Sequence, residues 1–98
     1  MAFVDEYDFN VLENQSEKLV VEELGRQIAA FKGSICLCDT CVIDMAAMAM
    51  NTVKPLYHVS LLGTQYTSQA MSERSYAASL KDSVAKAIKR VKDNPAHD

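Results

Sequence analysis

The chain has 98 residues, of which 49% are hydrophobic and 23% are charged; this composition predicts one globular domain spanning 1–98 and excludes disorder for most of it. Its net charge of −3 at pH 7 excludes a general binder of nucleic-acid polymers, because such a protein needs a basic face. Only three glycines and two prolines supply turns, which favours a mainly α fold with a few long helices over a many-stranded sandwich.

The first eight residues are acidic and carry no helical pattern. Asp5, Glu6 and Asp8 stand where a secretory signal has a basic start followed by an apolar run. Further along the chain, no apolar run approaches the roughly 18 residues that a membrane span requires. We therefore expect a cytoplasmic protein with reduced thiols and no membrane contact, in which 1–8 form a frayed lead-in and about 9–92 form the ordered core.

A first amphipathic helix is predicted within residues 9–31, because apolar residues recur there at helical steps. Glu22 and Arg26 are spaced for an i,i+4 ion pair on its surface. Gly25 weakens a helix, and at such a position it more often marks the close approach of a second helix than a break. The helix is expected to end at 32–34, where a glycine tolerates a left-handed cap.

All three cysteines fall within six residues, as Cys36, Cys38 and Cys41. A C-x-x-C spacing at a helix start lets two thiolates point at one ion, and the positive potential of a helix N-terminus favours the thiolate form. This cysteine knuckle predicts a zinc ion held by the three sulfurs. Two other interpretations are a thioredoxin-like redox pair, which belongs in a βαβ setting that is absent here, and three reduced core cysteines without a metal.

The fourth ligand of such a zinc site is not a cysteine, since a closed structural site has four ligands and the chain has three cysteines. The candidate sources are His58, His97, Asp39, a water molecule or a group from a second subunit. His58 is the most economical of them, because it lies in the predicted ordered part of the chain. The alternative for His58 is an ordinary polar histidine with no metal.

The second helix is predicted from near Asp39 to Met50, directly after the cysteine knuckle. Apart from Asp44, its residues after the knuckle are apolar all round the helix: Val42, Ile43, Met45, Ala46, Ala47, Met48, Ala49 and Met50. Such a helix is normally enclosed by other elements, and two further long elements can hardly surround it alone. We therefore expect a homodimer whose interface includes this helix, a contact to which methionines are well suited.

Asn51 is the candidate C-cap of the second helix, and Pro55 prevents its continuation. The stretch 57–66 contains β-branched and aromatic residues but alternates only weakly. It predicts a short β segment or one edge hairpin before the next helix.

A third helix is predicted over about 68–92, with Thr67 or Ser68 as its cap. Its buried stripe consists of Ala77, Leu80, Val84, Ala87, Ile88 and Val91, and its other side is mostly basic. Residues 50–98 hold seven basic and four acidic side chains, a charge of 7 − 4 = +3 within an acidic chain. Such asymmetry indicates either packing of opposite charges or a local anion site.

These motifs together resemble the ComFB family of late competence development proteins, over roughly residues 14–91. The resemblance rests on an Asn-x-x-Glu helix start, a C-x-C-x-x-C-x-x-D block, a later Asn and a P-x-Y motif. In this chain they are Asn14 and Glu17, then Cys36, Cys38, Cys41 and Asp44, then Asn51, Pro55 and Tyr57. The resemblance implies a small, mainly helical homodimer with a cysteine-bound zinc. Some members carry a further cysteine near the C-terminus that can complete the metal site, and this chain lacks it.

The same resemblance implies a receptor for cyclic dinucleotide second messengers, cyclic di-GMP above all with cyclic di-AMP as the other candidate, which signals through an unidentified partner protein. Such a ligand needs Arg or Lys groups for its phosphates and flat side chains for its bases. The candidate ligand-binding residues are Tyr57, Tyr66, Thr67, Arg74 and Lys81. Their alternatives are core packing for the tyrosines and a surface ion pair for the arginine. The alternative function is a zinc-stabilised dimeric interaction module without a small ligand, and no nucleophile–base constellation indicates an enzyme.

Overall fold

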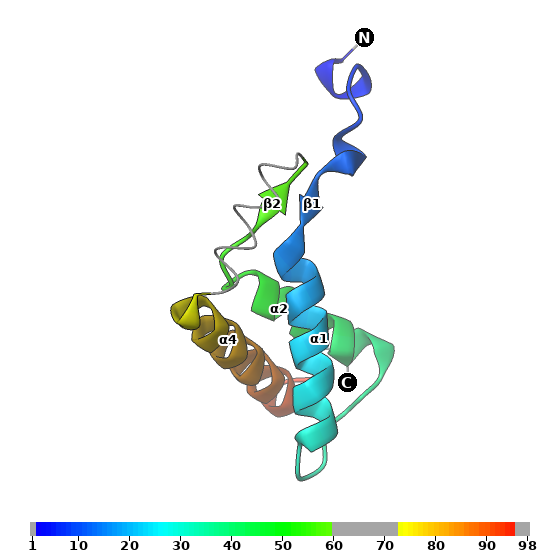
Figure 1. The fold of residues 1–98 in the computed structure, drawn as a ribbon. Helices are drawn as coiled ribbons and strands as arrows, with labels where there is room; N and C mark the ends of the chain where they lie inside the picture. Colours follow the sequence, from blue (N-terminus) through cyan, green and yellow to red (C-terminus); the bar gives the residue numbers. More distant parts are fainter. Residues whose placement is uncertain (1, 60–72, 96–98) are drawn as a thin grey trace.

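The computed structural model describes residues 2–59 and 73–95, and it confirms the mainly α fold (Figure 1). Two short 3-10 turns and a two-residue strand precede the first helix, and a second two-residue strand follows the second helix. In chain order the described elements are η1 (Phe3–Asp5), η2 (Phe9–Val11), β1 (Glu13–Asn14), α1 (Gln15–Ala30), α2 (Asp39–Met50), β2 (Tyr57–His58) and α4 (Arg74–Asp93). None of the described helices is long and apolar enough to cross a membrane.

The core lies where α1, α2 and α4 meet, and each of these helices contacts the other two. From α2 it takes Cys41, Met45 and Ala49, one residue per turn along a single face. The remaining buried apolar side chains are Val20 and Leu24 of α1, Val53 and Leu56 of the following segment, and Tyr76, Leu80, Val84, Ala87, Ile88 and Val91 of α4. Each fully buried large side chain contributes about 1.5–3 kcal/mol, so this shared stripe holds the three helices together.

The bounds of α2 match the prediction from Asp39 to Met50, and Asn51 is its C-cap as expected. The Asn51 backbone N–H donates to the Ala47 carbonyl at 3.1 Å. As expected, the other helices of the single chain do not surround α2, because Ile43 is 67% exposed and Ala47 is also exposed. One face of this apolar helix therefore remains uncovered by the described residues.

The first helix begins later than its apolar pattern predicts. Residues 9–11 form the separate turn η2, where the Asp8 side chain accepts a hydrogen bond from the Asn10 backbone at 3.1 Å. Asn14, with an extended backbone, then caps α1 by accepting from the Ser16 backbone N–H at 3.2 Å. The helix stops at Ala30, where Phe31 turns extended, so the glycine at position 33, with φ of 120°, follows the cap instead of forming it.

Two expectations about side chains on α1 are wrong. Arg26 pairs with Glu23 at 2.7 Å, one residue along from the predicted partner Glu22. Both spacings are compatible with a helical ion pair, and the sequence contains two adjacent glutamates. Gly25 does not mark a close helix contact, since nothing lies within 4 Å of where its Cβ would be. The helix nevertheless continues through it, as predicted.

The predicted short β segment is present as β2, and residues 60–66 of the predicted stretch, on which the hairpin alternative depends, lie outside the described residues. In the described chain β2 pairs antiparallel with β1, so that Glu13 faces His58 and Asn14 faces Tyr57 across a large sequence separation. The helix predicted over about 68–92 is α4, which begins at Arg74 after an extended Glu73, six residues later than predicted. Its expected caps, Thr67 and Ser68, lie outside the described residues.

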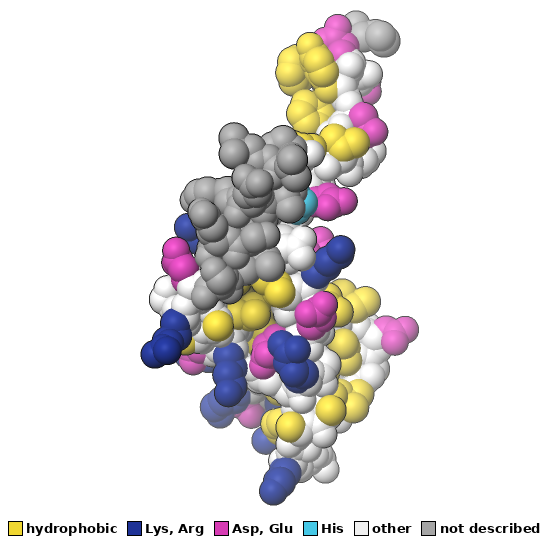
Figure 2. Space-filling model, in the orientation of Figure 1, with side chains coloured by type: hydrophobic (Ala, Val, Ile, Leu, Met, Phe, Trp, Pro, Cys, Tyr) yellow, Lys and Arg dark blue, Asp and Glu magenta, His cyan; other side chains and the backbone are white. Residues whose placement is uncertain are grey.

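The N-terminal segment, residues 2–12, extends from the helical body beyond β1 (Figure 1). We refer to this segment as the arm. Its apolar side chains are exposed to solvent and gather on its surface in the space-filling view (Figure 2). The turns of the arm therefore contribute no buried side chain to the core.

Candidate functional site

The three cysteines lie at the start of α2. Cys36 comes from the approach loop, Cys38 is the N-cap residue and Cys41 lies in the first turn. The sulfur of Cys38 accepts a hydrogen bond from the Cys41 backbone N–H at 3.5 Å. Cys41 is buried in the core, Cys36 is half-buried and Cys38 is exposed, so the group reaches from the core to the surface.

The donor set fits a soft metal ion. All three Sγ atoms lie within 4.8 Å of one another. Sulfurs bound to one zinc at about 2.3 Å in a tetrahedron are about 3.8 Å apart, so small side-chain rotations bring them to ligand positions. The helix N-terminus beneath them adds positive potential that favours thiolates over thiols. The cysteine group predicted from the spacing is therefore confirmed as an arrangement that can hold a metal.

His58 is not brought together with the sulfurs. It lies on β2, beyond the far end of α2, and the 12 residues of that helix rise about 18 Å. Its Nε2 atom is 3.8 Å from a carboxylate oxygen of Glu13 on the neighbouring strand. Within one chain, this placement argues against His58 as the fourth ligand. Of the other candidates, Asp39 is exposed at the start of α2, and His97 lies outside the described residues.

Exposed apolar side chains accompany the cysteine end of α2. Leu37, between two of the cysteines, is 53% exposed, and Ile43 is 67% exposed one turn into the helix. The exposed Ala47 follows Ile43 by one further turn, on the same face. This strip is the uncovered part of α2 and continues up to the candidate metal centre.

The predicted ligand residues are only partly described. Tyr57 is exposed on β2, whereas Tyr66 and Thr67 lie outside the described residues. Arg74 and Lys81 are exposed on α4, seven residues apart, and therefore lie on one face of that helix. The hydroxyl of Tyr76 donates to the Lys54 carbonyl at 3.2 Å. This bond joins the start of α4 to the segment that leads into β2, so Arg74 and Tyr57 flank the same junction.

Arg74 is the first residue of α4, whereas the predicted start near residue 68 would place it about two turns after the cap. The first turn of α4 contains no acidic residue, and the Glu73 side chain makes no capping hydrogen bond. A cation at a helix N-terminus opposes the helix dipole, whereas a bound anion there interacts favourably with both the dipole and the guanidinium. The start of α4 is accordingly a position where an anion would be stabilised.

Three polar residues with structural roles were not found from the sequence. Asn14 was assigned only to a motif, yet its Oδ1 atom accepts from the Leu56 backbone N–H at 2.8 Å and from the Ser16 hydroxyl at 2.7 Å. Glu23 is buried and accepts from Arg26 and from Gln27, whose amide also donates to the Lys81 carbonyl at 3.0 Å. These hydrogen bonds, the one from Gln27 first, lower the pKa of the Glu23 carboxyl below its usual range despite its burial.

A second group of basic side chains on α4 was also not assigned to a site from the sequence. Lys86 and Arg90 line an open pocket of about 440 Å³ between α4 and the end of α2, beside Met48 and Asn51. Asp82, which pairs with Lys86 at 2.9 Å, lies in the same pocket and offsets part of its charge. Only the helical spacing of the basic residues in the sequence hinted at this grouping.

The fold and the cysteine group define a small, mainly helical protein with a candidate metal centre at a helix start. A family model described as "Late competence development protein ComFB" matches residues 13–95. The chain therefore belongs to the ComFB family. No curated protein matches the chain.

Among solved structures, the late competence protein ComFB from Bacillus subtilis is similar, with a TM-score of 0.67 and 23% sequence identity. The similarity covers 87% of this chain and 92% of that chain. At 23% identity, this similarity shows a shared fold and nothing further.

Proposed function

We propose that the protein is a receptor for a cyclic dinucleotide, with cyclic di-GMP as the first candidate, and that it signals through a partner protein. In this role it is a cytoplasmic homodimer that binds zinc and carries out no catalysis. The observation that carries the proposal is the junction between β2 and the start of α4, where a guanidinium, a helix N-terminus and an exposed tyrosine lie close to the hydrogen bond from Tyr76 to Lys54.

The phosphates of the ligand find their partners at the start of α4. The planar guanidinium of Arg74 can contact two phosphate oxygens at once, and helix N–H groups favour the same anion. Lys81, two turns further on the same face, adds a second cation. These two cations belong to the half of the chain that carries a charge of +3, seven basic less four acidic residues.

The bases of the ligand require flat side chains. Tyr57 is 60% exposed although tyrosine rings are usually buried in part, and its strand is tied to α4 through the Tyr76–Lys54 bond. A base stacked on such a ring contributes about 1–3 kcal/mol without regard to its identity. We assign Tyr66 and Thr67, which fall between Tyr57 and Arg74 in the chain, to the same site.

Calorimetric titration of the purified protein with cyclic di-GMP and with cyclic di-AMP tests the proposal directly. Arg74→Ala is expected to weaken binding about ten- to a hundredfold, since a charge-assisted bidentate contact is worth about 1.5–3 kcal/mol. Arg74→Lys is expected to recover only part of this loss, because lysine lacks the planar fork. The melting temperature of both variants should stay close to that of the wild type, because Arg74 is exposed.

The matched control is Arg90→Ala, which removes an exposed arginine from the same helix 16 residues, or about 24 Å, away. Absence of binding by the wild-type protein to either nucleotide refutes the receptor function. If Arg90→Ala weakens binding and Arg74→Ala does not, the function survives, and the ligand belongs to the pocket of Lys86 and Arg90.

The second candidate function is a zinc-stabilised dimeric interaction module without a small ligand. It is favoured by the cysteine group, whose donors suit zinc, together with the uncovered strip of Leu37, Ile43 and Ala47 beside it. An exposed apolar strip of this kind is typical of a protein–protein contact. A second copy of the chain presents the same strip, which makes a two-fold symmetric interface possible without further adaptation.

Sedimentation analysis together with metal determination tests this second function. A dimer at micromolar concentration that Ile43→Lys dissociates supports it, with Val21→Lys, an exposed apolar residue of α1, as the matched control. A stable monomer with zinc bound would remove the dimeric part of both candidate functions. A dimer that fails to bind either nucleotide would leave the interaction module as the function.

A further inference from the structure

The arm carries an exposed aromatic cluster that the core does not use. Phe3, Tyr7 and Phe9 are 65%, 60% and 47% exposed, yet their ring centroids lie 4.9–6.3 Å apart. Exposed aromatic rings that pack on one another form an apolar surface suited to a partner. The same segment contains Asp5, Glu6 and Asp8 and no basic side chain. The arm is thus both aromatic and acidic.

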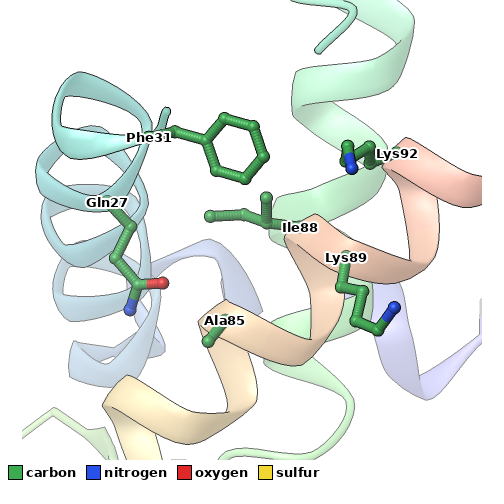
Figure 3. A pocket seen from close by; sticks show the side chains of 6 residues that line it. All are labelled: Gln27, Phe31, Ala85, Ile88, Lys89 and Lys92. Atoms are coloured by element: carbon green, nitrogen blue, oxygen red, sulfur yellow. The ribbon is translucent and has the colours of Figure 1, made fainter. Parts of the chain in front are cut away.

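A pocket of complementary character lies between α1 and α4 at the opposite end of α1. Its volume is about 310 Å³, and its apolar lining consists of Phe31, Ala85 and Ile88 (Figure 3). Lys89 and Lys92 line it as well, from the last turns of α4 (Figure 3). The Lys92 ammonium sits 5.8 Å from the centre of the Phe31 ring. This pocket therefore combines room for an aromatic side chain with two cations.

We propose that the arm of one copy docks an aromatic side chain into the α1–α4 pocket of a second copy, with its carboxylates against Lys89 and Lys92. Burial of one such ring stabilises the contact, and the opposite charges fix its orientation. Asp93 already pairs with Lys89 at 3.2 Å, so Lys92 is the cation more available to the arm. The contact is separate from the α2 strip and does not depend on nucleotide binding.

Docking on a second copy is favoured over docking within one chain, because the folded arm is too short to reach the pocket of its own chain. The pocket lies beside Gln27 and Phe31, so most of α1, which is about 24 Å long, separates it from the arm. Phe9 is four residues from β1 and spans at most about 14 Å. Phe3 reaches its own pocket only if both 3-10 turns unwind, whereas docking on another copy leaves the arm as it is.

A charge-exchange experiment tests the proposal. One variant reverses the arm (Asp5→Lys with Glu6→Lys), and another reverses the pocket (Lys89→Glu with Lys92→Glu). Each alone is expected to weaken self-association about tenfold in analytical ultracentrifugation at low salt, because two exposed pairs together contribute on the order of 1–2 kcal/mol. Mixing the two variants restores association, since each arm then faces a pocket of opposite charge.

The controls carry equal charge changes at other exposed positions, Glu17→Lys with Glu22→Lys and Lys18→Glu with Lys54→Glu. The arm exchange is supported if mixing the arm and pocket variants raises association, relative to each variant alone, by more than mixing the two controls raises it relative to each control alone. An equal rise in the two cases overturns the exchange, and so does wild-type association that neither reversal changes.

Two further outcomes separate this inference from the proposed function. If one chain that carries both the arm and the pocket reversals regains wild-type association, but the mixture of the two separate variants does not, the arm docks on its own chain. The exchange between copies is then refuted. If the dimer persists in all variants and only Ile43→Lys dissociates it, the α2 interface stands without the arm. Melting curves of each variant verify folding, and replacement of Phe3, Tyr7 and Phe9 by Ser provides a second test that leaves all charges in place.

Discussion

The two ends of α2 are secured by different chemistry. At its C-terminal end the chain supplies its own partners, because Asn14 accepts from the Leu56 N–H at 2.8 Å and Tyr76 donates to the Lys54 carbonyl at 3.2 Å. At the N-terminal end three sulfurs converge within 4.8 Å, and the Cys41 N–H donates to the Cys38 sulfur at 3.5 Å. One end is closed by directional hydrogen bonds between distant segments, and the other presents ligands suited to an ion.

This difference predicts different responses to substitution. Removing one hydrogen-bonding group near the C-terminal end of α2, such as that of Asn14, leaves a few buried polar atoms without partners. The free energy of unfolding then falls by an amount typical of lost hydrogen bonds. Removing one sulfur from the cysteine end weakens the whole site, because a metal bound by three protein ligands depends on each of them. The largest effects are therefore expected at the cysteines, and the smallest at the single bond from Tyr76.

Cys41→Ser is expected to have the largest effect. It removes a buried thiolate ligand, so zinc content should fall well below one ion per chain and the melting temperature should fall with it, by the equivalent of several kcal/mol. Metal analysis and thermal unfolding check both quantities. The control is Thr40→Ala in the same helical turn, which is exposed and should alter neither quantity. Wild-type protein purified without chelators that contains no zinc contradicts the prediction.

Asn14→Ala is expected to destabilise the protein by about 2–3 kcal/mol. The change removes the cap of α1, worth about 1 kcal/mol, and leaves the Leu56 N–H and the Ser16 hydroxyl without their acceptor. Urea unfolding measures the loss. Asn14→Asp keeps an acceptor oxygen at the same place and should retain most of the stability. An equal loss in both variants would show that the amide NH₂ group, and not the acceptor, matters.

The sequence predicted α2 from Asp39 to Met50 because all its signals are local: a cysteine pair at the start, continuous apolar residues and an Asn cap. The apolar pattern alone misplaced the start of α1, whereas the Asn-x-x-Glu motif of the family resemblance indicated a helix start at Asn14, the observed N-cap. The hydrogen bond from the Leu56 N–H to Asn14, 42 positions away, is a contact that no local pattern reveals. The cysteine group was predictable for the same reason as α2, since spacing alone brings its sulfurs together. His58 was assigned to that group without a local signal, and the structure pairs its strand with β1 instead.

Glu23→Gln is expected to cost about 1.5 kcal/mol at pH 7, because hydrogen bonds to a charged carboxylate are lost. The pKa of Glu23 in the folded protein is lowered from its ordinary value of 4.5, so as the pH falls past about 4.5 the unfolded chain binds more protons than the folded protein. The stabilisation by this carboxylate is therefore present above that pH and is lost as the pH falls through the folded pKa.

Urea titrations between pH 7 and pH 3 check this dependence. The difference in unfolding free energy between wild type and Glu23→Gln should shrink as the pH falls. Glu22→Gln on the exposed side of the same helix should differ little from wild type throughout. A difference that stays constant with pH would mean that Glu23 contributes through packing and not through its charge.

Tyr76→Phe is expected to have the smallest effect, about 0.5–1.5 kcal/mol at pH 7, since it removes one hydrogen bond to the Lys54 carbonyl and keeps the buried ring. Burial raises the pKa of the Tyr76 hydroxyl above its ordinary value of 10.0. The unfolded chain therefore releases this proton before the folded protein does, and wild-type stability falls as the pH rises past about 10. The phenylalanine variant lacks the hydroxyl proton, so the difference in stability between wild type and variant should narrow in alkaline solution and can change sign.

Chemical unfolding at pH 7 and pH 10.5 measures this difference in stability, and Tyr57→Phe, at an exposed ring, serves as the control. A difference that widens with pH would contradict the burial of the Tyr76 hydroxyl at the junction between α4 and the segment before β2.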